Sequence, residues 1–332
     1  MNVIVTGCAG FIGFHLSKQL LEQKVNVYGL DNLSSVNTER IGYCRLQILK
    51  NYKNFFFSQK SINQINTITF PKKIDLIINL AAVPGVRLER EKYDIYLESN
   101  VQGFKAVLDY AVSNKVNKII FASSSSVYGA NSNLPFLESE TDLSPESFYG
   151  LTKKFNEDYA KFYSKKYELN ITALRFFSVY GEYGRPDMAY FYFADQMKKG
   201  STIRLNNMGK MKRDMTYIDD ILCGIGSVID YMNDSNKKHS YEVFNLGNDN
   251  PIEISYMLKF IEENLSVKAK IIESNSFNEL IVTHADLKKA NKILGYKPKI
   301  KFEEGMEQFL KWYKNFFWKI YFFHISLITW FF

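Results

Sequence analysis

Tyr149 and Lys153 are spaced so that they could carry out proton transfer together. A separation of four residues on a helix places both side chains on one face. A tyrosine is a poor base at its usual pKa of about 10, but an adjacent ammonium favours the phenolate and lowers that pKa. Because many helices contain this spacing by chance, its interpretation depends on what surrounds it.

The N-terminal segment has the pattern of a dinucleotide-binding loop. A short apolar run over residues 2–6 leads directly into a glycine-rich turn and then into a helical pattern over residues 14–23. Such glycines allow a tight turn, close approach to a pyrophosphate and close packing of helix on strand. The residues of this loop that we expect to bind the cofactor are Gly7, Gly10, Phe11, Ile12 and Gly13.

A second apolar run, over residues 26–30, ends at Asp31. A carboxylate at this position of a dinucleotide-binding unit can bind both ribose hydroxyls of an adenosine. It would repel a ribose phosphate, so the sequence predicts NAD in preference to NADP.

Strand-like and helical patterns alternate through the first half of the chain. The strand-like runs cover residues 2–6, 26–30, 54–57, 74–80, 118–122 and 171–175, and the helical patterns cover 14–23, 38–51, 93–114 and 147–167. This alternation predicts an α/β fold, a Rossmann doubly wound parallel sheet with ligands at the carboxyl ends of its strands. The alternation stops beyond Gly181, where we expect a smaller C-terminal substrate-binding lobe.

The expected domains follow from these patterns. We predict an NAD-binding domain over residues 1–178 and roughly 214–248, a substrate lobe over 179–213 and 249–314, and an aromatic and apolar tail over 315–332. For the tail three interpretations compete: an anchor at a membrane interface, a stripe that packs on a partner subunit, or an extension without a role. The aromatic and apolar residues 316–332 reach only the low end of the length of about 20 residues that a span across a membrane needs.

Small and polar residues stand at the expected carboxyl ends of three strands. Ala81 and Ala82 follow the fourth strand, four serines over residues 123–126 follow the fifth, and Phe177 and Ser178 follow the sixth. Four hydroxyls at one strand end can donate several hydrogen bonds to a sugar. We expect one of them to bridge the substrate and Tyr149.

Composition excludes several classes of function. The 332 residues are 46% hydrophobic and carry a net charge of +7, without a run of five or more like charges, so a nucleic-acid surface is not predicted. The three cysteines give no disulfide framework, and the chain begins directly with a predicted strand, which favours a reducing cytoplasm and no signal peptide. The four histidines lack metal-binding spacing, and Asp219 and Asp220 suit capping and dipole stabilisation of the helical run that follows them better than a metal site.

Together these motifs resemble the extended short-chain dehydrogenases/reductases, specifically the nucleotide-sugar epimerases. The glycine loop, the serine run and the Tyr149 and Lys153 pair carry this resemblance. The closer similarity is to UDP-glucuronate 4-epimerases, in residues 85–87, 175–181, 184–189 and 209–220, and it covers about residues 1–314.

The resemblance implies a mechanism. Tyr149, lowered in pKa by Lys153 and by the nicotinamide charge, takes a proton from the 4-hydroxyl of the sugar while C4 gives a hydride to NAD. Lys153 also holds the nicotinamide ribose, and Ser124 hydrogen-bonds the reacting oxygen. The resulting 4-keto sugar turns over and takes the hydride back on its other face, so NAD stays bound.

The resemblance also implies binding residues. Beyond the glycine loop and Asp31, the cofactor is expected to meet Asn32, Leu80, Ala81, Ala82, Asn100, Tyr149 and Lys153. The substrate is expected to meet Val86, Arg87, Ser125, Ser126, Phe177, Ser178, Arg185, Met188 and Arg213. Serine hydroxyls are the candidates for the glucuronate carboxylate, and for each of Arg185 and Arg213 a surface ion pair is the alternative. One departure is Ser61, which stands where the family has an aspartate that meets adenine.

The serine run narrows the reaction. Related dehydratases carry an Asp-Glu pair and decarboxylating relatives a glutamate where this chain has Ser125 and Ser126. We therefore predict an epimerase that interconverts UDP-glucuronate and UDP-galacturonate, and the resemblance implies that it is a homodimer. The alternatives are a 4-epimerase of neutral UDP-sugars, another nucleotide-sugar epimerase or dehydratase, and a silent NAD-binding regulator. The intact set of Ser124, Tyr149 and Lys153 disfavours the last.

Overall fold

The computed structural model describes residues 1–34, 39–85, 90–130, 132–234, 240–274 and 280–317. Val86, Arg87 and nearly all of the predicted tail lie outside these residues. Within them, no helix has both the length and the apolar character to cross a membrane.

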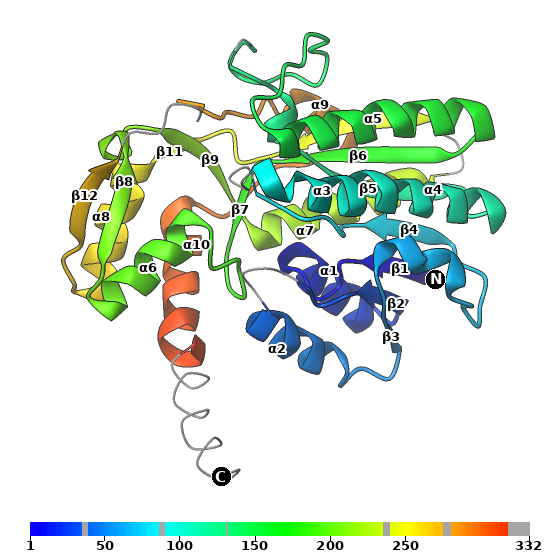
Figure 1. Cartoon of the computed structure of the whole chain (residues 1–332), viewed down its shortest axis with the longest axis horizontal. Coiled ribbons are helices and arrows are strands. Elements are labelled where there is room, and N and C mark those ends of the chain that lie inside the picture. Colours follow the sequence, from blue (N-terminus) through cyan, green and yellow to red (C-terminus); the bar gives the residue numbers. More distant parts are fainter. Residues whose placement is uncertain (35–38, 86–89, 131, 235–239, 275–279, 318–332) are drawn as a thin grey trace.

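The main structural element is a seven-stranded sheet in which every pair of neighbours is parallel (Figure 1). Its order is β3-β2-β1-β4-β5-β6-β10. The strands are β1 (Asn2–Thr6), β2 (Asn26–Asp31), β3 (Phe55–Gln59), β4 (Leu76–Asn79), β5 (Lys118–Ser124), β6 (Asn170–Phe176) and β10 (Tyr241–Leu246). The strand order reverses between β1 and β4, which is where ligands bind in open α/β sheets. The predicted doubly wound sheet is confirmed.

Helices cover both faces of this sheet. On one face lie α1 (Phe11–Glu22), α7 (Ile218–Asn233) and, packed on α1, α2 (Glu39–Leu49); on the other lie α4 (Gly103–Ser113) and α5 (Phe148–Tyr167) (Figure 1). Because neither face meets water, the strands have no polar side, and the three central residues of β1 are fully buried.

The second lobe lies to the left of the large sheet in Figure 1. It contains a three-stranded sheet of β7 (Ser178–Tyr180), β9 (Lys212–Tyr217) and β11 (Pro251–Glu253), and a two-stranded sheet of β8 (Thr202–Asn206) and β12 (Lys270–Ser274). Its helices are α6 (Ala189–Lys199), α8 (Ile254–Leu265) and α10 (Phe302–Trp312), whereas α9 (Lys288–Leu294) contacts β10 and α7.

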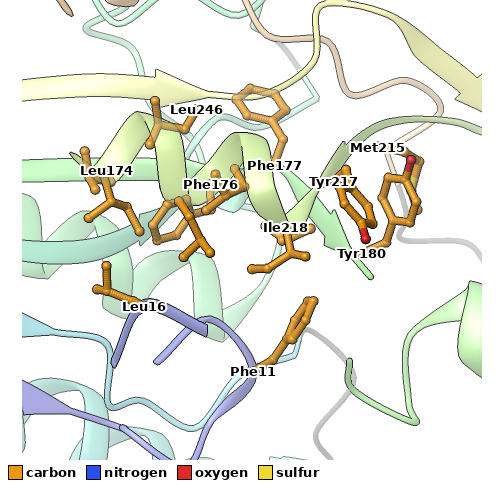
Figure 2. Packing of buried hydrophobic residues seen from close by; sticks show 14 of the residues in the cluster. Phe11, Leu16, Leu174, Phe176, Phe177, Tyr180, Met215, Tyr217, Ile218 and Leu246 are labelled. Atoms are coloured by element: carbon orange, nitrogen blue, oxygen red, sulfur yellow. The ribbon is translucent and has the colours of Figure 1, made fainter. Parts of the chain in front are cut away.

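One apolar core continues from the sheet into this lobe. Figure 2 shows Phe11 of α1 facing Ile218 at the start of α7, with Tyr180 and Tyr217 of β7 and β9 beside them. The rings of Tyr180 and Tyr217 meet edge to face, with centroids 5.5 Å apart. The shared core fixes the lobe relative to the carboxyl ends of the strands.

Two helical predictions differ from the structure. The pattern over residues 93–114 is divided into α3 (Tyr93–Tyr96), a π-helical segment Leu97–Gln102 and α4. The expected capping by Asp219 and Asp220 is wrong, because Tyr217 occupies the cap position and the carboxylate of Asp220 accepts the N–H groups of Lys299 and Ile300, at 2.9 and 3.0 Å. Both acids lie in the first turn of α7, where their charges favour the helix dipole as expected. Among the described residues no group of three or more side chains is placed to hold a metal.

Asp214 of β9 joins three segments of the C-terminal half. It is fully buried, and its carboxylate accepts the main-chain N–H groups of Asn248, Asp249 and Ala285 at 2.6, 3.1 and 3.0 Å. The lobe therefore depends on one side chain for three hydrogen bonds, of which the one from Ala285 is buried and the other two are partly buried.

Replacing Asp214 by alanine should destabilise the protein by about 2 kcal/mol or more, because the buried N–H of Ala285 left without a partner costs about 1–3 kcal/mol and each of the two other hydrogen bonds contributes about 0.5–1.5 kcal/mol. The control is Asp249→Ala, which removes an exposed carboxylate paired with His284 and should cost less than about 1 kcal/mol. Urea unfolding of both variants measures the difference. Equal losses would show that Asp214 does not hold the lobe together.

Candidate active site

The glycine loop after β1 is packed so closely that no side chain fits at Gly7 or Gly13. Gly7 has a φ of +69°, and a Cβ atom there would lie 2.8 Å from the amide nitrogen of Ala81. At Gly13 a Cβ atom would lie 2.0 Å from the carbonyl oxygen of Gly7. The close approach of Gly7 to Ala81 brings residues 80–82, which follow β4, alongside the loop.

The loop fits a dinucleotide. Gly10 caps α1 without a side chain, and the first main-chain bond of the helix runs from Phe14 N to Gly10 O, at 2.9 Å. The N–H groups of Phe11, Ile12 and Gly13 precede that bond and have no partner within the helix. A helix start of this kind binds a pyrophosphate.

Asp31 ends β2 beside the loop. Its two carboxylate oxygens accept the N–H groups of Ala9 and Leu33, both at 2.9 Å. Each oxygen keeps a lone pair for a ribose hydroxyl. Burial raises the pKa of this carboxyl, and the two N–H groups and the charge of Arg45 oppose the rise. The exposed neighbour Asn32 uses its side-chain oxygen to accept the N–H of Ser34.

Asn100, in the π-helical segment, anchors the loop that follows β4. It is buried, and its amide accepts the N–H of Val83 at 2.8 Å and donates to the Val83 carbonyl at 3.1 Å. It also donates to the hydroxyl of Thr152, which precedes Lys153, at 3.3 Å. Its side chain is thus used to position protein groups around the predicted cofactor site.

Ser61, which stands where the family has an aspartate that meets adenine, takes part in a turn. Its N–H donates to the side-chain oxygen of Gln64 at 3.1 Å, and its carbonyl accepts the Gln64 N–H at 2.9 Å. How this segment meets adenine stays a prediction.

Tyr149 and Lys153 lie together at the end of β5. Their helix, α5, begins where the Ser147 hydroxyl accepts the Gly150 N–H at 3.0 Å. The ammonium of Lys153, whose residue is only 3% exposed, donates to the carbonyl of Ala122 at 2.8 Å and lies 5.7 Å from the centre of the Tyr149 ring. The structure thus brings the predicted pair together.

The pKa values of this pair depart from the expectation. Burial raises the pKa of Tyr149, opposed by the charge of Arg185 and a hydrogen bond with Ser124. Burial lowers the pKa of Lys153 to about 8, opposed by Glu157. The prediction that Lys153 lowers the pKa of Tyr149 is therefore wrong for the protein chain by itself, because removal from water outweighs the charges nearby.

The serine run divides into two parts. Ser123 and Ser124 do not follow β5 as expected but end it, because parallel pairing continues to Ser123 with Arg175 and Ser124 with Phe176. The Ser124 hydroxyl accepts the Ser126 N–H and donates to the Ser126 hydroxyl, both at 3.1 Å. Ser123 is buried and donates to Glu157, so it has a structural role.

The two arginines that are predicted to bind the substrate have different surroundings. Arg185 lies near Gly85 and close enough to Tyr149 to influence its pKa, and it forms a bidentate pair with Asp187 at 3.0 and 2.5 Å. Arg213 instead donates to the carbonyls of Lys212 and Leu280, at 3.0 and 2.8 Å.

The other described substrate candidates lie after β5, at the end of β6 and at the start of the lobe. Phe177 is buried in the shared core, whereas Ser178 at the start of β7 and Met188 before α6 are half-buried, as are Ser125 and Ser126. Their contact with a substrate stays a prediction.

Two buried residues at the site escaped the sequence analysis. Glu157, one turn after Lys153 on α5, pairs with Arg175, and Arg45 on α2 bonds the glycine loop. The sequence contains a spacing pattern that indicates each of these two residues. Glu157 has the same four-residue spacing from Lys153, and Arg45 lies midway between the apolar residues Ile41 and Leu49, on the face that the helix buries.

Lys153→Met should stabilise the NAD-free protein at pH 7. The pKa of Lys153 is lowered in the folded state, so its burial costs stability in full below about pH 8, and that cost disappears as the pH rises towards the unfolded value of about 10.4. Allowing about 1 kcal/mol for the lost hydrogen bond, we expect a gain of about 1–2 kcal/mol at neutral pH that fades above about pH 8. Urea unfolding across this range is the measurement, with Lys154→Met as the control. A variant less stable than wild type at pH 7 would contradict the assigned cost.

Comparisons with known proteins place the chain. Residues 3–247 match the NAD dependent epimerase/dehydratase family. The uncharacterized protein MJ1055 of Methanocaldococcus jannaschii is 42% identical over 94% of this chain and 96% of its own. UDP-glucuronate 4-epimerase 4 of Arabidopsis thaliana is 38% identical over 96% of this chain and 76% of its own. The crystal structure of UDP-glucuronic acid 4-epimerase from Bacillus cereus, in complex with UDP-glucuronic acid and NAD, matches with a TM-score of 0.86 at 30% identity, over 95% of this chain and 99% of that chain. The chain belongs to the NAD-dependent epimerase/dehydratase family of extended short-chain dehydrogenases/reductases, and it is an NAD-dependent epimerase.

Proposed function

We propose that this NAD-dependent UDP-sugar 4-epimerase interconverts UDP-glucuronate and UDP-galacturonate. The observation that carries the proposal is the arrangement of Ser124, Tyr149 and Lys153 at the end of β5, next to hydroxyls at Ser125 and Ser126. The relatives named for UDP-glucuronate 4-epimerase activity support the substrate.

Tyr149 is the base that takes the proton from the 4-hydroxyl. The Ser124 hydroxyl lies close enough to lower the pKa of this phenol, so it can bind the reacting oxygen while Tyr149 exchanges its proton. The raised pKa of Tyr149 keeps the phenol protonated in the absence of cofactor. A positive charge brought beside the ring lowers that pKa and makes the phenolate accessible only in the assembled complex.

The cofactor is held by groups already in place. The N–H groups at the start of α1 bind the pyrophosphate, Asp31 binds the adenosine ribose, and Lys153 holds the nicotinamide ribose. NAD, when bound, accepts a hydride from C4 of the sugar and returns it to the opposite face.

The outcome is inversion at C4 because the serine turn has no acid. A dehydratase needs a proton donor to remove water, and residues 123–126 provide hydroxyls alone. Hydroxyl donors of Ser125, Ser126 and Ser178 suit the glucuronate carboxylate without a buried cation.

Proton NMR of the products formed from UDP-glucuronate tests the proposal. We expect UDP-galacturonate to accumulate with no loss of water or carbon dioxide. Formation of no epimer, with turnover of UDP-glucose instead, would overturn the substrate assignment. Tyr149→Phe should retain bound NAD and lose at least about 100-fold in turnover, because a general base contributes about 10²–10⁴-fold. Tyr159→Phe, which removes a phenol almost three turns further along α5, is the matched control and should remain active.

We also propose that the enzyme is a homodimer joined through α5. The helix exposes an apolar stripe of Leu151, Phe155 and Phe162, which are 50%, 44% and 53% exposed. Ile95 and Leu97, from segments that contact α5, extend the stripe. An apolar surface of this extent on one helix face is typical of a site covered by another protein. If a two-fold axis passes beside the helix, the same face of a second subunit covers this surface. The cytoplasmic location and the role of the tail stay predictions.

Charges on this stripe should separate the subunits. In the double variant Phe155→Glu and Phe162→Glu, two carboxylates per subunit would lose their hydration on association, and light scattering should give the mass of a single chain. Phe56→Glu on β3, where the ring is 43% exposed, is the control and should stay dimeric. A dimeric mass for the double variant would exclude this interface.

A further inference from the structure

Arg45 on α2 is the most deeply buried cation near the dinucleotide loop. It is 1% exposed, and within the described residues its hydrogen bonds end on main-chain carbonyl oxygens. Nη1 donates to Ala9 at 2.8 Å, Nε and Nη2 donate to Tyr183 at 3.1 and 2.5 Å, and Nη2 donates to Gly184 at 3.1 Å. One guanidinium therefore joins two loops that are distant in the sequence.

The first of these loops is the dinucleotide loop itself. Ala9 lies between Gly7 and Gly10, and it is held from both sides, because its N–H donates to Asp31 at 2.9 Å and its carbonyl accepts from Arg45. Asp31 and Arg45 also attract each other electrostatically. A ligand that orders the glycine loop or binds Asp31 therefore acts on the groups that hold Arg45.

The second loop joins β7 to α6 and has an unusual backbone. Gly181 and Tyr183 have φ angles of +145° and +53°. The carbonyl before Tyr183, that of Glu182, meets Nε2 of His15 at 2.8 Å. Burial lowers the pKa of His15 to about 4, so the ring is neutral and donates from this nitrogen. Three successive carbonyls are thus bound by α1 and α2 of the NAD-binding half.

Arg185 is the next residue of this loop after Gly184. At Gly184 a Cβ atom would lie 1.7 Å from the Tyr190 hydroxyl, so the path of the chain into Arg185 is fixed. Arg185 in turn lies close enough to Tyr149 to influence its pKa, and near Gly85. The loop that Arg45 holds therefore sets the position of the cation beside the catalytic phenol.

A guanidinium is suited to this position and an ammonium is not. Its planar fork can reach the Ala9 carbonyl on one side and the Tyr183 and Gly184 carbonyls on the other, whereas a lysine has a single nitrogen. Burying the charge opposes folding, so a purely structural contact between these loops could be made at lower cost by apolar side chains.

We propose that Arg45 is a positioning residue that couples the dinucleotide loop to Arg185, so that occupancy of either ligand site strengthens binding at the other. Ala9, Arg45 and the carbonyls of Tyr183 and Gly184 form the connection. It rests on the proposed function only for the identity of the ligands, NAD and a UDP-sugar. Because coupling between sites is reciprocal, UDP must tighten NAD binding by the same factor by which NAD tightens UDP binding.

The experiment measures the dissociation constant of NAD with and without saturating UDP, by quenching of protein fluorescence. In the wild-type protein UDP should tighten NAD binding by about fivefold or more, the range typical of coupled sites. In Arg45→Lys and Arg45→Gln the ratio of the two constants should fall below about twofold. Lys50→Gln, which removes a charge just after α2, is the control and should keep the wild-type ratio.

The ratio separates coupling from a structural role. A variant that only loosens the fold weakens NAD binding equally with and without UDP and keeps the ratio, and a wild-type ratio in Arg45→Lys would overturn the proposal. If Arg45→Gln does not fold, Arg45→Lys decides the question. A wild-type protein whose NAD affinity does not respond to UDP would also overturn it. Calorimetry with UDP alone is recorded in parallel, because absence of any UDP binding would refute the proposed function instead.

Discussion

Glu157 of α5 and Arg175 of β6 form a buried ion pair on which the geometry of the active site depends. Two hydrogen bonds of 2.9 and 2.6 Å join them, and Ser123 donates to the same carboxylate at 2.5 Å. Removing either partner would leave an uncompensated charge, which costs about 3–5 kcal/mol. Because Lys153 and Tyr149 precede Glu157 by one and two turns on the same face of α5, this pair fixes both side chains at the end of β5.

The ion pair of Glu157 and Arg175 also affects the pKa of the neighbouring catalytic groups. Glu157 is largely neutralised by Arg175, so its carboxylate only partly offsets the burial that lowers the pKa of Lys153 to about 8. The charge of Arg185 opposes the rise in the pKa of Tyr149, but Arg185 is itself paired with Asp187. The chain alone thus holds its base in the protonated form, and the charge needed to activate it must come with the ligands.

What could be predicted from the sequence is what local spacing determines. The glycine loop, Asp31 at the end of β2 and the four-residue spacing of Tyr149 and Lys153 can each be recognised from the residue pattern of a short segment, and the structure places them as expected. The contacts that could not be predicted are distant in the chain. Arg45 and Tyr183 lie 138 positions apart, and the effect of burial on the pKa of Tyr149 depends on packing that spacing does not reveal.

The central claim is that the hydride removed from C4 returns to the same sugar within one active site. The most direct measurement uses UDP-glucuronate carrying deuterium at C4, with the products resolved by NMR and mass spectrometry. The account predicts UDP-galacturonate that retains the deuterium at C4, with none passing to water or to added NAD. Replacement of the deuterium by solvent hydrogen would contradict it, because the C4 hydrogen would then have left as a proton.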